Sequence, residues 1–264
     1  MTNERAVQRN SAVSVQTGSG GRLLDWDGVC NARDLGGLRL TGGETIRSGA
    51  LVRADNLARL TPDGWRSLHR FGIGTIVDLR DPAVERSTYR DEAGPIEIVR
   101  VSVLDLSDVD FWSSMRGEQD AGRFYRAALE RWPGAFAAAV CAIARARPGG
   151  VVVHCQAGKD RTGLVTALAL ASVGVERSEI ALEYQQATGR VAALLQLAAY
   201  ADELREAANR TQLRLTNAAG GRSILEALDS LDLSAYLANG GFTSGDASAL
   251  RDRLLQPVLG ANRP

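Results

Sequence analysis

Apolar residues in the first two thirds of the chain follow two spacings, one typical of strands and one typical of helices. Runs of β-branched and other apolar residues predict buried strands at 73–79, 96–104 and 149–154. Apolar residues three and four positions apart predict helices at 123–131, 135–147 and 162–173. Because strands and helices alternate, the pattern favours an α/β fold with a mainly parallel central sheet flanked by helices.

Capping and turn residues set the limits of the elements near the N-terminus. Thr61 and Pro62 are a typical N-cap and first helical residue, and Gly72 ends the short helix that they begin. Glycines and turn formers divide residues 26–49 into short apolar pieces. This composition indicates loops and a small hairpin.

The last third of the chain has helical patterns and no predicted strand. A region rich in Ala, Leu, Glu and Arg extends from 178 to 210, and further helical patterns occupy 223–231 and 234–237. Thr243 begins a final helix with a sequence that resembles a capping box. We expect a single domain at 22–264, which includes a helical lid at about 178–240.

Two segments of the chain are candidates for a membrane signal, and neither fits one. Residues 1–21 lack the apolar core of a secretory signal, so we expect a disordered tail there. The most apolar long stretch, 191–200, is interrupted by Gln196 and is too short to span a bilayer. We therefore expect a soluble protein without stable membrane insertion.

The charge of the chain limits which partners it can attract, and its cysteine content indicates in which compartment it resides. Lys and Arg together number 31, as do Asp and Glu, so no net field attracts nucleic acid or anionic lipid. The three cysteines, Cys30, Cys141 and Cys155, are too few and too far apart for a disulfide framework or a zinc site. We expect a cytoplasmic monomer that binds no nucleic acid, although export without a signal stays open.

The clearest chemical signature lies between predicted strand 149–154 and predicted helix 162–173, where the chain reads HCQAGKDRTG from His154 to Gly163. A loop that enters a helix N-terminus directs its NH groups at one point, where the helix dipole adds partial positive charge. The only lysine of the chain, Lys159, lies in this loop. The sequence therefore predicts a phosphate-binding loop.

Two side chains of that loop, Cys155 and Arg161, predict nucleophilic attack on a bound phosphate. The amides and the Arg161 guanidinium stabilise a thiolate at Cys155, which makes it a nucleophile toward phosphorus. Arg161 can bind two phosphate oxygens with its planar fork, whereas a lysine would lose that geometry. Thr162 is placed to donate a hydrogen bond to the Cys155 sulfur when it leaves. A cysteine after a valine run is more often a core residue, but Cys-x5-Arg on a strand-to-helix turn favours catalysis.

This signature resembles that of the atypical bacterial tyrosine phosphatases, a branch of the dual-specificity superfamily that includes lipid-active members. Further blocks resemble the same family in order and spacing, namely Asn31–Gly37, Ile46–Gly49, Leu51–Ala54 and Val77–Arg80. The resemblance extends over roughly 26–255. It implies a tyrosine phosphatase-like fold and hydrolysis of phosphomonoesters through a phosphocysteine, most plainly as a protein-tyrosine phosphatase with dual or lipid specificity.

The resemblance also assigns substrate contacts. It implies that Lys159 and Asp160 accompany activity on several phosphoester classes, including phosphoinositides, and that Arg53 adds a basic contact beside the site. The remaining expected phosphate-binding residues are Gln156, Ala157, Gly158, Thr162 and Asp78. The chain departs from the family in its less regular lid and in a short connection between Leu104 and Arg123.

The proton donor to the leaving group has several candidates. The resemblance favours Asp160, inside the loop, although its basic neighbours favour the ionised form. Asp78 ends a predicted parallel strand, where α/β sheets bind ligands, and an ion pair with Arg80 is its structural alternative. Three aspartates after the second predicted strand are further candidates or simply a solvated loop: Asp105, Asp108 and Asp110.

Other functions remain open at this point. A phosphatase of a small phosphorylated metabolite would satisfy the same loop, and a catalytically silent relative would bind phosphorylated partners without hydrolysis. A rhodanese-like sulfurtransferase is disfavoured by the five residues before the arginine, and an arsenate reductase would need Cys30 or Cys141 near Cys155. We expect no metal and no cofactor, because amides, Arg161 and the covalent step supply the charge neutralisation.

Overall fold

The computed structural model describes residues 22–83, 89, 91–194 and 220–255. The expected tail, 1–21, and a large part of the expected lid, 195–219, lie outside the described residues. Among the described helices, none has the length and apolar content that crossing a bilayer requires.

A six-stranded sheet lies at the centre, in the order β1-β2-β3-β6-β4-β5. Its strands are β1 (Arg22–Leu23), β2 (Arg33–Asp34), β3 (Leu51–Ala54), β4 (Ile73–Asp78), β5 (Glu97–Arg100) and β6 (Gly150–His154). β3, β6, β4 and β5 pair with one another in parallel. β2 pairs antiparallel with β3, and β1 pairs antiparallel with β2 at the edge of the sheet. The predicted α/β fold with a mainly parallel sheet is confirmed.

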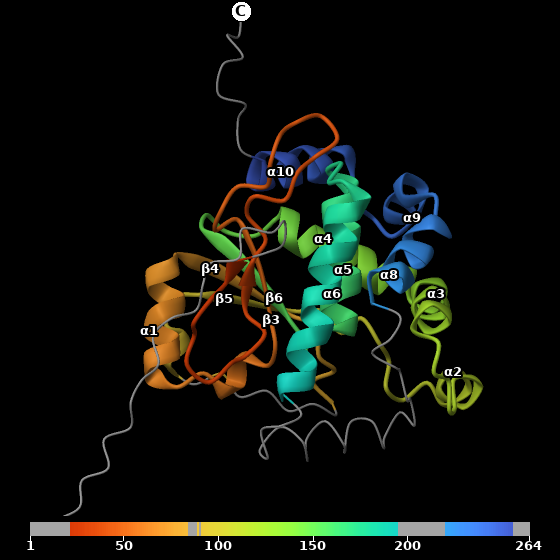
Figure 1. Cartoon of the computed structure of the whole chain (residues 1–264), viewed down its shortest axis with the longest axis horizontal. Helices are drawn as coiled ribbons and strands as arrows, with labels where there is room; N and C mark the ends of the chain where they lie inside the picture. Colours follow the sequence, from red (N-terminus) through yellow and green to blue (C-terminus); the bar gives the residue numbers. More distant parts are fainter. Residues whose placement is uncertain (1–21, 84–88, 90, 195–219, 256–264) are drawn as a thin grey trace, which may run out of the picture.

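Helices cover both faces of this sheet (Figure 1). They are α1 (Pro62–Phe71), α2 (Val109–Ser114), α3 (Ala121–Arg131), α4 (Pro133–Ala144), α5 (Asp160–Ser172), α6 (Arg177–Leu194), α8 (Gly220–Asp229), α9 (Leu233–Asn239) and α10 (Ser244–Leu254), with 3-10 turns at Leu57–Arg59 and Asp91–Ala93. In Figure 1 α1 lies on one side of the strands, and α4, α5 and α6 lie on the other.

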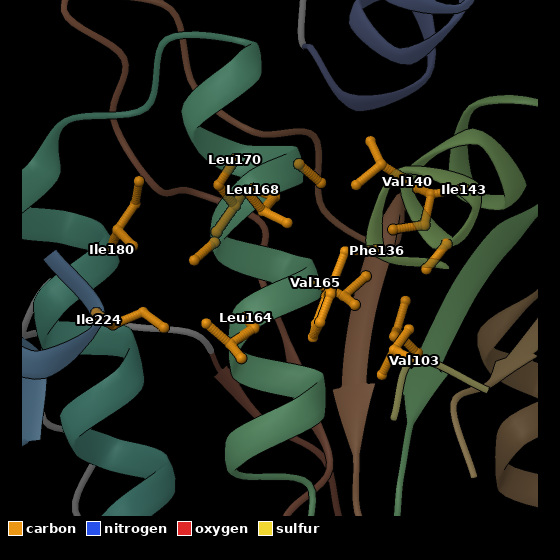
Figure 2. Close-up of a cluster of buried hydrophobic side chains, with 14 of the residues drawn as sticks. Val103, Phe136, Val140, Ile143, Leu164, Val165, Leu168, Leu170, Ile180 and Ile224 are labelled. Atoms are coloured by element: carbon orange, nitrogen blue, oxygen red, sulfur yellow. The ribbon is translucent and has the colours of Figure 1, made fainter. Parts of the chain in front are cut away.

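Alternation along the strands divides the core in two, because successive side chains of a strand point to opposite faces. Val152 of β6 packs with Trp65 of α1 in one cluster. Its neighbours Val151 and Val153 belong to the larger cluster on the other face. In Figure 2 α5 crosses the middle of this larger cluster, with Ile180 and Ile224 on one side and side chains of α4 on the other.

The helix limits follow the capping residues. Thr61 accepts a hydrogen bond from Gly64 N at the start of α1, and Gly72 ends that helix in the left-handed conformation. Thr243 and Asp246 form a complete capping box at α10. Both predictions are confirmed.

Three elements differ from the prediction. β5 is only four residues long, because the chain leaves the sheet edge after Arg100. β3 was not predicted, since its four residues include a charged one, Arg53, yet all four are buried. The connection between Leu104 and Arg123 contains α2, whose N-cap is Asp108.

Candidate active site

The loop with the Cys-x5-Arg signature lies at the carboxyl edge of the sheet. β6 ends at His154 between its parallel neighbours β3 and β4, and Cys155 follows with 3% of its surface exposed. α5 begins at Asp160 without a side-chain cap on its first turn. The amides at this helix start have no partner within the helix, so they are available to an anion.

The carbonyl oxygens of four consecutive loop residues accept hydrogen bonds from the surrounding protein. These bonds are Asn56 N to Gln156 O at 3.1 Å, Asn31 Nδ2 to Ala157 O at 2.9 Å and to Gly158 O at 3.3 Å, and Arg53 Nη2 to Gly158 O at 2.6 Å and to Lys159 O at 3.2 Å. Since the carbonyl groups are held from outside, the loop can turn its NH groups inward.

Gly158 makes this loop conformation accessible. Its φ is +66°, and a Cβ there would lie 2.5 Å from the carbonyl oxygen of Ala54. Any other residue would combine a disfavoured left-handed backbone with a clash against β3. The close approach of the loop to β3 therefore depends on this glycine.

A buried ionic network holds the outer side of the loop. Glu183 of α6 pairs with Arg53 at 2.5 Å and with Arg33 at 2.6 Å, and all three side chains are at most 2% exposed. Arg33 also donates to Asn31, which in turn donates to the loop. Burial opposes the charge on Glu183, but the two arginines outweigh it and hold the pKa of Glu183 below its ordinary value.

The Arg53 guanidinium has partners within the protein. It is fully buried and binds Glu183 and the loop carbonyl groups of Gly158 and Lys159. In this position it supports the loop from behind, on the side of the carbonyl groups.

Asp160 lies beside two buried tyrosines. Tyr125 of α3 donates a short hydrogen bond to Asp160 Oδ1 and makes another with Tyr184 of α6. The Lys159 Nζ atom is 3.7 Å from the same carboxylate oxygen, and the Asp160 side chain is 33% exposed. The carboxyl group is thus held by neighbours and still accessible from the outside.

Asp78 is occupied within the protein. Its carboxylate accepts two bonds from the Arg80 guanidinium, at 2.9 and 3.1 Å, and one from the Tyr89 hydroxyl at 2.7 Å. Burial alone would raise the pKa of Asp78, but His154, Arg80 and Tyr89 stabilise the carboxylate and keep the pKa well below its ordinary value. Such a carboxylate carries no proton to donate at neutral pH.

His154 lies between this cluster and the loop. Its Nε2 atom is 2.6 Å from the Tyr89 hydroxyl, and its Nδ1 atom is 3.1 Å from the Cys155 carbonyl oxygen. Burial lowers the pKa of His154 to about 4 despite the nearby Asp78 carboxylate. The ring is therefore neutral at pH 7 and serves to fix the chain before Cys155.

The three aspartates after β5 have local structural contacts. Asp105 accepts from Ser107, and Asp108 caps α2 and pairs with Arg131 at 2.7 Å. Asp110 lines a shallow hollow of about 370 Å³ between α2 and α3, to which no residue of the phosphate loop contributes. These contacts favour a structural interpretation of Asp105 and Asp108.

Other loop side chains lie as follows. Lys159 is 5% exposed, and Gln156 is 7% exposed. The hydroxyl of Thr162 is buried and has no hydrogen-bond partner among the described residues. Within the described part of the chain, no group of His, Cys, Asp and Glu could hold a metal ion.

The other two cysteines have different surroundings. Cys30 packs with Ala157 and Val191, at the edge of the loop. Cys141 belongs to α4 and lies 3.9 Å from the carbonyl oxygen of Gly241. All three cysteines are free thiols.

Sequence reasoning did not identify Tyr125, Tyr184 or Glu183 as site residues. A signal was present on α6, where Ile180, Glu183, Tyr184 and Ala187 follow helix spacing and are all buried. A glutamate on a buried helix face requires a partner of opposite charge. Arg33 and Arg53 supply it, but only the folded chain shows which arginines do so.

Comparison with known proteins gives one consistent family. The profile of a family described as "Tyrosine phosphatase family" matches residues 24–256. A Cupriavidus necator protein whose name describes it as a tyrosine-protein phosphatase is 32% identical over 200 residues, which cover 72% of this chain and 71% of that protein. The triple specificity protein phosphatase PtpB of Mycobacterium tuberculosis is 28% identical over 258 residues, covering 80% of this chain and 92% of that protein.

Among solved structures, TpbA of P. aeruginosa aligns with 74% of this chain and 89% of its own at 15% identity, with a TM-score of 0.32. A score this low bears on neither fold nor function. The family profile and the sequence relatives identify the family of this chain.

Proposed function

The chain belongs to the tyrosine phosphatase family, and from this premise we propose that its loop hydrolyses phosphotyrosine and related phosphomonoesters through a phosphocysteine at Cys155. The observation that carries the proposal is the set of four outward-held carbonyl groups from Gln156 to Lys159. They leave the opposite side of the loop to its amides, directly beside a thiol.

In the first step the Cys155 thiolate attacks phosphorus, and the bond between phosphorus and the ester oxygen breaks. The loop amides and the Arg161 fork neutralise the three equatorial oxygens. Asp160 gives its proton to the departing oxygen. Its partly exposed carboxyl beside the loop supports this role over Asp78, which is buried and ion-paired.

In the second step water attacks the phosphocysteine, and the sulfur leaves as a thiolate. The Asp160 carboxylate now accepts a proton from the water, which returns the acid to its starting form. The unpartnered Thr162 hydroxyl can turn toward the leaving sulfur. Inorganic phosphate then departs from the amides of Gln156, Ala157 and Gly158.

For substrates, we propose phosphoproteins and phosphoinositides, handled by a cytoplasmic monomer without nucleic-acid partners. Lys159 and Asp160 in the loop support breadth beyond phosphotyrosine, and one relative carries a triple-specificity name. We also keep the proposal that a tail at 1–21 precedes a single phosphatase domain, 22–264, with a helical lid at about 178–240.

A panel of substrates tests the function. Phosphotyrosine and phosphothreonine peptides, a phosphoinositide and a sugar phosphate are assayed with wild type and with Cys155→Ser. We expect hydrolysis of the peptides and the phosphoinositide by wild type and none by the variant. Turnover of the sugar phosphate alone would reassign the protein as a metabolic phosphatase, and none at all would favour a silent binding module.

Lys159→Ala refines the same assay. If Lys159 contacts the additional phosphates of an inositol ring, the variant loses more kcat/KM on the phosphoinositide than on an aryl phosphate. Equal losses on both would assign Lys159 to the reacting phosphate or to its neighbour Asp160.

A further inference from the structure

We propose that Tyr125 and Tyr184 form a hydroxyl relay that positions the Asp160 carboxyl for proton transfer. This inference rests on the proposed role of Asp160 as the general acid. It assigns both tyrosines as positioning residues, because their hydroxyls form hydrogen bonds to Asp160 and to each other.

The three groups come from three different helices. Tyr125 is on α3, Tyr184 is on α6, and Asp160 is the first residue of α5. The Tyr125 hydroxyl makes short hydrogen bonds to both Asp160 Oδ1 and the Tyr184 hydroxyl, and the Tyr184 oxygen is 3.5 Å from the same Oδ1 atom. Both tyrosines are at most 2% exposed.

Gly163 allows α6 to approach this closely. A Cβ on Gly163 would lie 2.7 Å from the ring of Tyr184. The ring therefore sits directly against the first turn of α5, where its hydroxyl reaches the carboxyl of Asp160. A position set by helix packing gives the relay little freedom to move.

Counting hydrogens fixes the direction of the relay. Burial, together with the nearby Asp160 charge, raises the pKa of both tyrosines well above the ordinary value, so both hydroxyls keep their protons. Tyr125 donates to Oδ1, and Tyr184 then donates to the Tyr125 oxygen. Oδ1 is occupied in this way, which leaves Oδ2 to hold the catalytic proton.

Two kinetic consequences follow. A donor on Oδ1 stabilises the carboxylate that remains after proton transfer, and it fixes the rotamer that points Oδ2 at the leaving oxygen. The other charged groups that face this site are Lys159, at 3.7 Å from Oδ1, and Arg53, which acts on Tyr184. Neither replaces the lost donor, because the Lys159 ammonium lies beyond hydrogen-bond distance from Oδ1 and the Arg53 guanidinium binds Glu183 and the loop carbonyl groups.

The test uses Tyr125→Phe, which removes one oxygen and keeps the ring in the core. We expect kcat on phenyl phosphate to fall about tenfold, with a much smaller loss on 4-nitrophenyl phosphate, whose leaving group needs little protonation. The alkaline limb of the pH–rate profile should move to higher pH, because the carboxylate has lost a hydrogen-bond donor. Tyr184→Phe should show the same changes to a smaller degree.

Tyr236→Phe is the matched control, since this partly buried hydroxyl donates its hydrogen bond to the Leu129 carbonyl at 3.0 Å and not to Asp160. Its pH profile and leaving-group dependence should equal those of wild type. If Tyr125→Phe behaves like the control, the relay is wrong.

Asp160→Asn separates this inference from the proposed function. Loss of the alkaline limb and a steep leaving-group dependence in Asp160→Asn support Asp160 as the acid, and adding Tyr125→Phe should then change nothing further. If Asp160→Asn keeps both features of wild type, the proposed acid is wrong. If Asp160→Asn has its effect and Tyr125→Phe has none, only the relay fails.

Discussion

Asp78 and Asp160 differ in their surroundings, and this difference is the reason that we propose Asp160, and not Asp78, as the proton donor. Asp78 is 1% exposed and accepts a two-point contact from Arg80, which keeps it ionised. Asp160 is partly exposed and its contacts leave one carboxyl oxygen for substrate. The sequence presented both as candidates, because burial and partner geometry decide between them and neither is visible in a residue name.

The burial of His154 predicts how the stability of the protein depends on pH. Burial lowers its pKa from 6.5 to about 4, so the unfolded chain binds more protons between these two values. Its contribution to stability is fully present above pH 6.5 and is lost as the pH falls toward 4. We expect the free energy of unfolding to drop by about 2 kcal/mol between pH 7 and pH 5 from this group alone.

Urea unfolding at several pH values between 7 and 5 measures this effect before the carboxylates of Asp78 and Glu183, whose pKa values are lowered, begin to titrate. His69→Gln removes the exposed ring at α1 and should leave the slope unchanged. His154→Asn should remove most of it. A flat wild-type profile would mean that His154 is already an imidazolium in the folded protein.

At the scale of elements, α6 connects the body of the protein to the loop through adjacent residues. Glu183 reaches the loop carbonyl groups through Arg53, and Tyr184 reaches Asp160. β3 holds Arg53 in a strand that sequence patterns did not predict, because a charged residue interrupts its apolar run. Most helices and the strands β4, β5 and β6 were predicted from spacing, whereas these polar contacts depend on packing between distant segments.

Glu183→Gln tests this connection. Removing the charge leaves Arg33 and Arg53 buried without a full counter-charge, which should cost about 3 kcal/mol of stability. The loop then loses its fixed carbonyl contacts, so kcat should fall at temperatures where the variant is still folded. Thermal melts and steady-state kinetics measure the two effects.

Glu179→Gln is the matched control on the same helix. Glu179 is also buried, but it pairs with Arg39, which is 60% exposed, at 2.6 Å. A smaller loss of stability and unchanged kcat are expected. If both variants lose activity equally, α6 acts on the fold in general and not on the loop.

At the scale of the whole molecule, the phosphate loop lies at the carboxyl ends of the parallel strands, where α/β sheets bind their ligands. β6 lies inside the sheet between β3 and β4, so its carboxyl end opens at the sheet edge with support from both sides. The two core clusters hold this strand from opposite faces, and helices lie on both sides of the sheet (Figure 1). The alternating pattern of the sequence predicted the mainly parallel sheet flanked by helices, but not the place of β6 beside β3, because β3 itself was not predicted.

The most direct measurement is chemical trapping of the intermediate. Asp160→Asn, which slows hydrolysis of the phosphoenzyme, is mixed with 4-nitrophenyl phosphate, quenched rapidly and digested for mass spectrometry. The account predicts one phosphoryl group on the sulfur of Cys155 and none after Cys155→Ser is introduced. Phosphate on another residue, or normal turnover by Cys155→Ser, would contradict it.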